Sequence, residues 1–293
     1  LIYRMPMRTQ EYQRLQMRPM TPKILFSLVF LGTIAILALI IPFLPFDPNG
    51  MAPYLIGSPE APSLSHWFGT DDLGRDLLLR SIYGARISLM VGLVSVSISL
   101  SIGVFIGLIS GFIGGTIDMA IMRTIDVLMA LPTLFLILMV QVTLEPSIFN
   151  VMVVIGVTSW MGTARIVRAE VLSFKERPFI TACRARGLSE QKVLFKHILP
   201  HTLNPVIVAA MLGMGGAILV ESVLSFLGLG VQPPNASWGN MLENSLGFLR
   251  DAPWMALIPG ILITLTVLSL NFLGDGLWLL LDPKAKEKYA KHT

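Results

Sequence analysis

Hydrophobic residues gather in six long uncharged runs, separated by polar segments. The runs come close to or exceed the roughly 20 residues that a helix needs to cross the hydrocarbon layer of a membrane. The second run is too long for one straight span, but Gly111, Gly114 and Gly115 predict where it ends. The pattern therefore predicts six transmembrane helices, in the runs 24–46, 87–117, 127–144, 146–164, 197–220 and 252–274.

A further stretch, 222–242, is also uncharged. It contains Gly228, Gly230, Pro233 and Pro234, and residues of these types interrupt helices. We interpret it as an irregular external loop that dips back toward the membrane. Seven spans are the alternative count.

Positive charge predicts the orientation of these helices, because cytoplasmic loops carry an excess of lysine and arginine. Of the 22 basic residues, five lie in 1–23, eight in 165–202 and four in 284–293. Six spans place all three segments on one side, so both termini are predicted to be cytoplasmic. A seventh span would send the lysine-rich tail outside, which argues against it.

This topology divides the chain into five parts. The first helix follows polar, basic residues, and no small-residue cleavage site follows it, so we expect a membrane anchor rather than a cleaved signal peptide. The parts are a cytoplasmic segment 1–23, a first transmembrane helix 24–46, an external segment 47–86, a core 87–283 with the other five helices, and a cytoplasmic tail 284–293; the core includes a cytoplasmic loop 165–202 and an external loop 222–251.

Composition agrees with an all-α integral membrane protein. Hydrophobic residues make up 54% of the 293 and charged residues 14%, against about 25% charged in soluble domains. No block of like charge or interleaving of basic and aromatic residues suggests nucleic-acid binding. The single cysteine, Cys183, excludes an internal disulfide.

Small residues recur at every fourth position in two of the predicted spans. Such ladders let another helix backbone approach closely. Among the few charges within the spans, Arg123 and Asp126 are three residues apart and are expected to pair on one helix. The ladders are Ser95, Ser99, Gly103, Gly107 and Gly111 in the second span, and Ala209, Gly213 and Ala217 in the fifth.

The loop 165–202 is the one long charged stretch between apolar runs. Pro178 suits the first turn of a helix, and Gly187 can adopt the left-handed conformation that ends one. Ser189 is a good N-cap for a second, short helix, which Pro200 is expected to stop. We predict a helix, a glycine corner and a second helix, and call residues 178–200 the elbow. The alternative is a solvated amphipathic loop, but a linker needs far fewer residues.

The elbow resembles the cytoplasmic loop of permease subunits of ABC importers, in which small residues, a glycine and a distal Leu-Pro stand at characteristic separations. Thr181 departs from that pattern, since an acidic residue is common there, and Cys183 stands where alanine is common. The resemblance implies that the elbow forms a coupling helix that docks into a groove of a separate ATP-hydrolysing subunit. The ATPase-coupling residues that it implies are Thr181, Ala182, Cys183, Arg184, Gly187, Leu188, Leu199 and Pro200.

Three further pairs of stretches resemble the dipeptide and oligopeptide permeases that act beside a second, related permease. Nickel and glutathione importers share the pattern. The resemblance implies the type I importer permease fold with about six helices. The stretches are 68–76 with 84–89, 225–234 with 237–241, and 270–276 with 281–283.

The external segment carries a cluster of aspartates at 71, 72 and 76, whose spacing does not match a calcium-binding EF-hand loop. We expect them to cap a helix and to face solvent or a soluble partner. The apolar residues Leu73, Leu77, Leu78 and Ile82 predict a short helix at the outer membrane interface. The residues expected to face an external binding protein are Asp71, Asp72, Arg75, Asp76, Gln232 and Trp238.

The sequence has no phosphate-binding Gly-x-x-x-x-Gly-Lys-Ser/Thr loop, no His-Glu-x-x-His and no nucleophile elbow. His197 and His201 are four apart but straddle Pro200. We therefore expect no catalytic residue, no metal site and no cofactor on this chain, and we expect ATP and Mg²⁺ on partner subunits.

The sequence thus predicts a non-catalytic permease subunit of an ATP-driven importer of di- or oligopeptides in the inner membrane of a prokaryote. Its implied partners are a second homologous permease, two ATP-binding subunits, an extracytoplasmic binding protein and membrane lipid. Nickel or glutathione is the alternative cargo. A stand-alone secondary transporter or channel, and a membrane scaffold or sensor, are the alternatives from other classes.

Overall fold

The computed structural model describes residues 22–281, which form helices and connecting loops without a β-strand. Five helices are long and apolar enough to cross a membrane, and a bent helix pair makes a sixth span if it is counted as one. The predicted cytoplasmic segment 1–23 and tail 284–293 lie almost wholly outside the described residues.

The spanning helices are α2 (Pro22–Ile40), α3 (Leu77–Ile113), α6 (Ile148–Lys175), α9 (Leu199–Phe226) and α11 (Trp254–Leu281), and the bent pair is α4 (Gly115–Met129) and α5 (Thr133–Thr143). The shorter elements are η1 (Ile41–Phe43), η2 (Pro53–Leu55), α7 (Pro178–Ala185), α8 (Glu190–Lys192), η3 (Val193–Ile198), α10 (Trp238–Asn244) and η4 (Leu246–Phe248).

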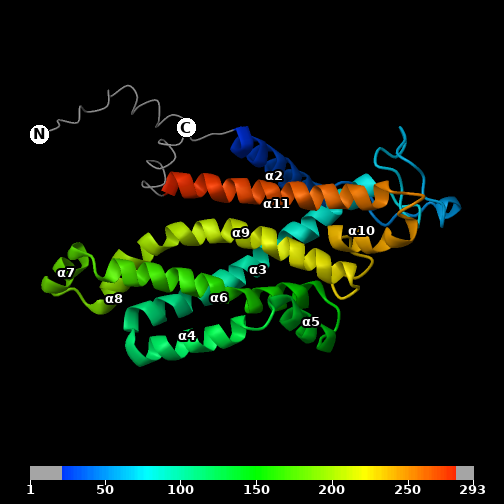
Figure 1. The fold of residues 1–293 in the computed structure, drawn as a ribbon. Helices are drawn as coiled ribbons and strands as arrows, with labels where there is room; N and C mark the ends of the chain where they lie inside the picture. The colour runs from blue at the N-terminus through cyan, green and yellow to red at the C-terminus, as the bar shows by residue number, and fades with distance from the viewer. Residues whose placement is uncertain (1–21, 282–293) are drawn as a thin grey trace, which may run out of the picture.

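The long helices run between two ends of the molecule (Figure 1). One end holds α7 and α8, and the last turn of α11 lies on the same side; we call it the elbow end. The opposite end holds residues 44–76 and α10, and we call it the loop end. This division agrees with the predicted topology, in which the elbow and the C-terminal end of the last span share a side.

The predicted ladder of small residues in α3 packs against α6. A Cβ added to Gly103 would lie 2.6 Å from the Thr163 Cβ, and one added to Gly107 would lie 2.5 Å from the Ala164 carbonyl oxygen. At Gly111 the Cβ would lie 2.8 Å from the Val171 Cβ. Any side chain at these positions would separate the helices, so the close approach that the ladder predicts is confirmed.

No separate interfacial helix precedes the second span, so that prediction is wrong. Leu77, Leu78 and Ile82 belong to the first turns of α3, which continues without a break to Ile113. Asp76 caps its start, because the carboxylate Oδ1 accepts a 2.9 Å hydrogen bond from the Leu79 N–H. The cap makes Leu77 the first residue of one long helix, and Gly114, at φ +73°, ends it as predicted.

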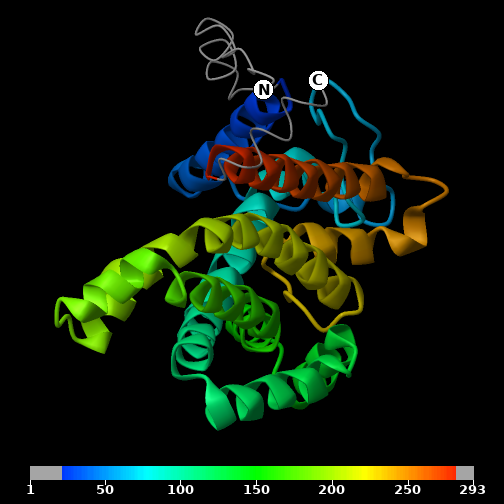
Figure 2. The same ribbon diagram turned by 60° about the vertical axis from the view of Figure 1, so that its left-hand side comes forward.

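The third span is not one straight helix over 127–144. α4 and α5 are bent by 79° to each other across a short break. Pro132 lies in that break, where a proline has no N–H to donate and disfavours helical backbone at Leu131. The bent pair lies along the outside of the bundle, and its main contacts are with α3 and α6 (Figure 2).

The stretch 222–242 contains no seventh span, but it is less irregular than predicted. α9 continues through Phe226, and α10 begins at Trp238. Ser237 caps α10 in a reciprocal arrangement with Asn240, which fixes the helix start. The predicted external loop therefore contains the end of a spanning helix, a turn-rich segment and a short helix.

Candidate functional site

The elbow begins as predicted, with Pro178 in the first turn of α7. The helix ends at a corner where Gly187 has φ +80° and donates its N–H to the Arg184 carbonyl at 2.9 Å. A residue with a Cβ rarely adopts this conformation, so the corner depends on glycine. Ser189 stands at the cap position of α8, but its side chain makes no cap hydrogen bond.

Pro200 does not stop the second helix, which corrects the prediction. α8, η3 and α9 form one helical run, Glu190–Phe226. η3 is a π-helical turn, in which the Leu199 N–H donates to the Leu194 carbonyl. Pro200 therefore lies inside this run, at the second position of α9 and shortly after the π-helical turn. The elbow is thus continuous with a spanning helix.

The inner side of the elbow is built into the apolar core. Ile180, Val193 and Ile198 have no exposed surface, and they share a cluster with Val167 and Val171 of α6. Leu108 of α3 and Val206 of α9 complete it, with other residues packed around them. The partly buried members include Cys183, Leu188, Leu194 and Leu199.

Aromatic contacts connect the start of α7 to the neighbouring helices. The Phe174 and His201 rings stack with centroids 5.0 Å apart, and Phe179 meets His201 edge-on at 6.2 Å. The Arg177 guanidinium lies 3.8 Å above the Phe174 ring. These contacts hold the α6–α7 turn against α9.

The outer side of the elbow is exposed. Of the predicted coupling residues, Thr181, Ala182, Gly187 and Pro200 are exposed, and the other four are half-buried. Arg184 forms a two-point ion pair with Glu190, at 2.9 and 3.0 Å, which closes the corner. The side chains of Phe179 and Phe195 are also exposed here, although neither was among the predicted coupling residues. An aromatic residue in a polar loop is the sequence feature that could have identified them.

Ion pairs tie α4 to the end of α6 that leads into the elbow. Arg168 makes two hydrogen bonds to Asp118, which also accepts one from Ser110 of α3. Asp126 pairs with Arg165 at 2.6 Å, so the predicted local pair with Arg123 is wrong. The partner of Asp126 comes from another helix that lies beside α4.

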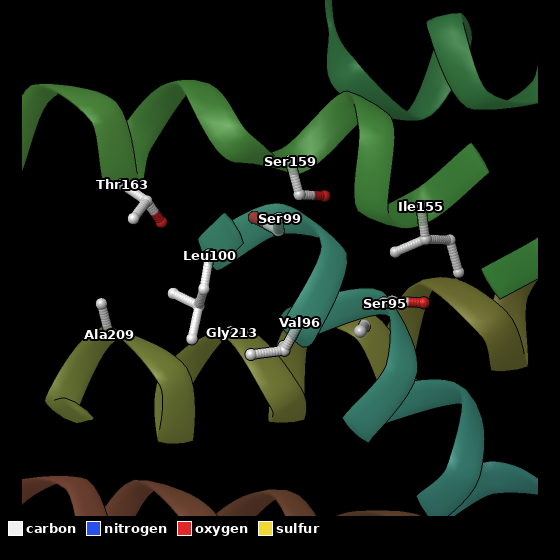
Figure 3. A pocket seen from close by; sticks show the side chains of 10 residues that line it. Ser95, Val96, Ser99, Leu100, Ile155, Ser159, Thr163, Ala209 and Gly213 are labelled. Carbon is white, nitrogen blue, oxygen red and sulfur yellow. The ribbon is translucent and has the colours of Figure 1, made fainter. Parts of the chain in front are cut away.

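Between α3, α6 and α9 lies a small cavity of about 70 Å³ (Figure 3). The hydroxyl-bearing residues Ser95, Ser99, Ser159 and Thr163 share its lining with Ala209, Gly213 and Ala217. The second predicted ladder therefore borders this cavity. The space is far smaller than the 300 Å³ or more typical of ligand pockets.

At the loop end, three predicted external residues are buried, which is a correction. Asp71 is buried with Arg75 at 2.6 Å, and the Arg80 Nε lies 3.5 Å from the same carboxylate. Arg80 also donates to the Asn49 side chain at 3.0 Å. Trp238 is fully buried and donates its indole N–H to the Ser81 carbonyl at 3.0 Å. These side chains hold the loop end together and present no external surface.

The other predicted external residues are only partly buried. Asp76 pairs with His66 at 2.9 Å, and the Gln232 amide donates to the Gly228 carbonyl at 3.0 Å. Burial raises the pKa of Asp72, and the charge of Asp71 raises it further. Within residues 22–281, no group of three or more His, Cys, Asp or Glu side chains is placed to hold a metal.

These features describe a helical membrane protein of the ABC importer permease class. The solved structure of the MetNI methionine ABC transporter in an inward-facing conformation has a chain that matches 70% of this one and 98% of its own length, with a TM-score of 0.55 and 19% identity. At that identity the match supports the fold alone.

Residues 103–287 match the model of the family described as binding-protein-dependent transport system inner membrane component. The chain belongs to this family, which confirms the resemblance found in the sequence and places the protein in the inner membrane as a multi-pass component.

Three relatives are similar over most of the chain. The dipeptide transport system permease protein DppC of Bacillus subtilis is 40% identical over 94% of this chain and 85% of its own. The dipeptide permease protein of the same name from Alkalihalophilus pseudofirmus is 43% identical over 78% of this chain and 75% of its own. The oligopeptide permease protein OppC of B. subtilis is 38% identical over 80% of this chain and 76% of its own.

Proposed function

We propose that this chain is a permease subunit that translocates di- or oligopeptides across the cytoplasmic membrane, driven by ATP hydrolysis on separate subunits. One observation carries the proposal: the elbow exposes small residues on one side and buries its other side in a cluster shared by α3, α6 and α9. The named peptide permease relatives support the cargo class and give no support to nickel or glutathione.

The coupling mechanism follows from this anchoring. A motor subunit that displaces the exposed face of the elbow also displaces Ile180, Val193 and Ile198, which are fully buried. Close-packed interiors transmit such a shift instead of absorbing it. Because the second helix of the elbow forms one helical run with α9, and Phe174 of α6 stacks on His201 of α9, both spanning helices move with it. Their movement changes which side of the membrane has access to the path.

The motor and its cofactors belong to other polypeptides in this proposal. The chain has no phosphate-binding loop, so ATP and Mg²⁺ are assigned to two partner subunits at the elbow end. A binding protein is assigned to the loop end. This chain then performs no covalent chemistry.

A second, homologous permease is the proposed neighbour along α4 and α5. Large apolar side chains on this bent pair are exposed, among them Val127, Phe135, Met139 and Val142. Lipid covers part of such a surface, and a second permease facing the bent pair would enclose the path between the two subunits.

A stand-alone secondary transporter is the alternative class, and it requires ionisable groups along the path or an inverted repeat. Purification from the native membrane separates the classes. An importer permease is expected to bring an ATPase with it whose activity rises with peptide-loaded binding protein. Uptake of a labelled dipeptide in competition with nickel and glutathione tests the cargo.

The central test is Gly187→Val in the complete importer. Valine at φ +80° is strained, and we expect peptide uptake to fall by about tenfold or more while membrane insertion is unchanged. Gly32→Val is the matched control, since Gly32 also has open space around it but lies in α2 with ordinary helical backbone. Uptake that is equal in the two variants would contradict a coupling role for the corner.

A further inference from the structure

Glu221 is the most deeply buried carboxylate among the described residues that lies inside a spanning helix. It has no exposed surface, and α9 contains no other Asp, Glu, Lys or Arg. An ionisable group at such a position is costly unless its hydrogen-bonding capacity is met, and it marks a functional position by default. The function proposed above assigns it no role.

Two serines from different helices bind the two carboxylate oxygens. Ser225, one turn further along α9, donates to Oε1 at 2.7 Å. Ser88 of α3 donates to Oε2 at 3.4 Å. Ser222 and Ser237 also face the carboxylate. Glu221 thus links α3 to α9 near the loop end.

Each of the two serines also accepts a backbone N–H from the segment that follows α9. The Val231 N–H donates to the Ser225 hydroxyl at 2.9 Å, and the Trp238 N–H donates to the Ser88 hydroxyl at 3.3 Å. A hydroxyl that accepts from an N–H has its own proton free to donate. Both serines therefore direct a proton to Glu221, one to each of its carboxyl oxygens.

The segment 228–237 lies very close to this cluster. A Cβ on Gly230 would lie 2.1 Å from the Ser225 hydroxyl, and one on Gly239 would lie 2.7 Å from the Ser222 Cα. Asn240 holds the segment from the other side, with hydrogen bonds to the Val231 and Asn235 carbonyls at 3.1 and 2.7 Å. Its tip stays exposed at Pro233, Pro234 and Asn235.

We infer that Glu221 is a positioning residue that holds the exposed tip 233–235 at the loop end, through Ser88 and Ser225, in the arrangement that the external binding protein contacts. The assignment of the binding protein to this end rests on the proposed function. The positioning of the tip rests only on the hydrogen bonds above. Because the same carboxylate joins α3 to α9, a relative movement of these helices also moves the tip.

The first experiment tests positioning on this chain without any partner. Cys183 is the only cysteine, so Cys183→Ala with Asn235→Cys gives one site for a nitroxide spin label at the tip. In lipid nanodiscs we expect Glu221→Ala to increase the mobility of the label strongly, and Ser88→Ala and Ser225→Ala to increase it by less. Ser95→Ala is the matched control, because Ser95 is equally buried on α3 but donates to the Met152 carbonyl of α6.

Glu221→Gln keeps the size of the side chain and covers the case in which Glu221→Ala does not fold. Glutamine accepts through one oxygen only, so it satisfies one of the two donating serines and leaves the other unpaired. We expect a mobility between those of wild type and alanine. The inference would be overturned if the label were equally immobile in all variants, or if Ser95→Ala raised its mobility as much as Glu221→Ala does. Either result would count whether or not the chain is an importer.

The second experiment uses the importer with its partner subunits in nanodiscs. ATPase activity is measured without the binding protein and against its concentration. We expect Glu221→Ala to raise the half-maximal binding-protein concentration by about tenfold. A lower basal rate with an unchanged half-maximal concentration would contradict positioning of a contact surface. If wild type shows no stimulation, the proposed function fails, and the label mobility still decides the role of Glu221.

Discussion

The two ends of the molecule are held together by different forces. At the elbow end, the fully buried anchors are the aliphatic residues Ile180, Val193 and Ile198, and the Arg184–Glu190 ion pair is at the surface. At the loop end, buried charges and hydroxyls add their contacts to an apolar cluster around Trp238, with Asp71, Arg80 and Glu221 among them. Apolar packing is non-directional, whereas a buried polar network depends on the geometry of each bond.

This difference suits the two proposed roles. An apolar anchor transmits displacement and stays intact while helices shift slightly against each other. A network of directed hydrogen bonds holds a surface in one arrangement and breaks as a unit. We therefore expect substitutions at the elbow end to lower stability in proportion to the side-chain volume they remove. Substitutions at the loop end are expected to lower stability by leaving a buried polar partner unpaired.

The largest expected effect is at the loop end. Asp71→Ala leaves Arg75 and Arg80 buried without their carboxylate, and we expect a loss of about 3–5 kcal/mol in the free energy of unfolding. Thermal unfolding of the purified protein in detergent measures it. Asp251→Ala is the control, since Asp251 is an exposed aspartate at the same end. If the two variants unfold alike, the loop end does not depend on its buried charges.

A smaller and graded effect is expected at the elbow. Ile180→Val removes one methylene, at about 0.5–1.5 kcal/mol, and Ile180→Ala leaves a cavity, at about 2–5 kcal/mol. Peptide uptake and thermal stability are expected to fall in the same order. Phe195→Ala changes an exposed side chain of the same segment and serves as the control for thermal stability. Loss of function that is complete in Ile180→Val would argue against a graded apolar anchor.

The smallest effect is a gain of stability at Asp72. Its folded-state pKa lies above the ordinary 3.8, because burial and the charge of Asp71 both disfavour the carboxylate. The protonated form therefore stabilises the fold below the ordinary pKa, and that contribution is lost as pH rises through the raised pKa.

Asp72→Asn is accordingly expected to unfold at a higher temperature than wild type at pH 7, and the difference is expected to shrink as the pH falls toward 4. Melting curves across that range check it. A difference that is constant with pH would show that Asp72 affects stability by some means other than its ionisation.

Local sequence patterns predicted much of the architecture. The apolar runs located the spanning helices, and Pro178 and Gly187 located the start and the corner of the elbow. The glycine ladder of α3 predicted a close helix neighbour, which is α6. These patterns succeed because hydropathy, helix capping and glycine conformation depend on residues that are near one another in the chain.

The misses have a common cause in contacts between distant residues. Asp126 was assigned to Arg123 on its own helix, but Arg165 lies nearer across the helix interface. Trp238 was predicted to face an external binding protein, but Gly84 leaves room beside α3 for the indole ring. No periodicity in the sequence identifies either partner.

The amino-acid sequence alone determined the class of the protein, its spanning helices, and the polar elbow that joins two of them. Only the tertiary structure decided that α9 continues through Pro200, that Asp71 and Trp238 are buried, and that Glu221 is joined to α3 by Ser88. The physical reason is the separation along the chain of the residues that determine each feature. Burial in a membrane follows from local hydropathy, whereas the partner of a buried charge depends on which helices meet.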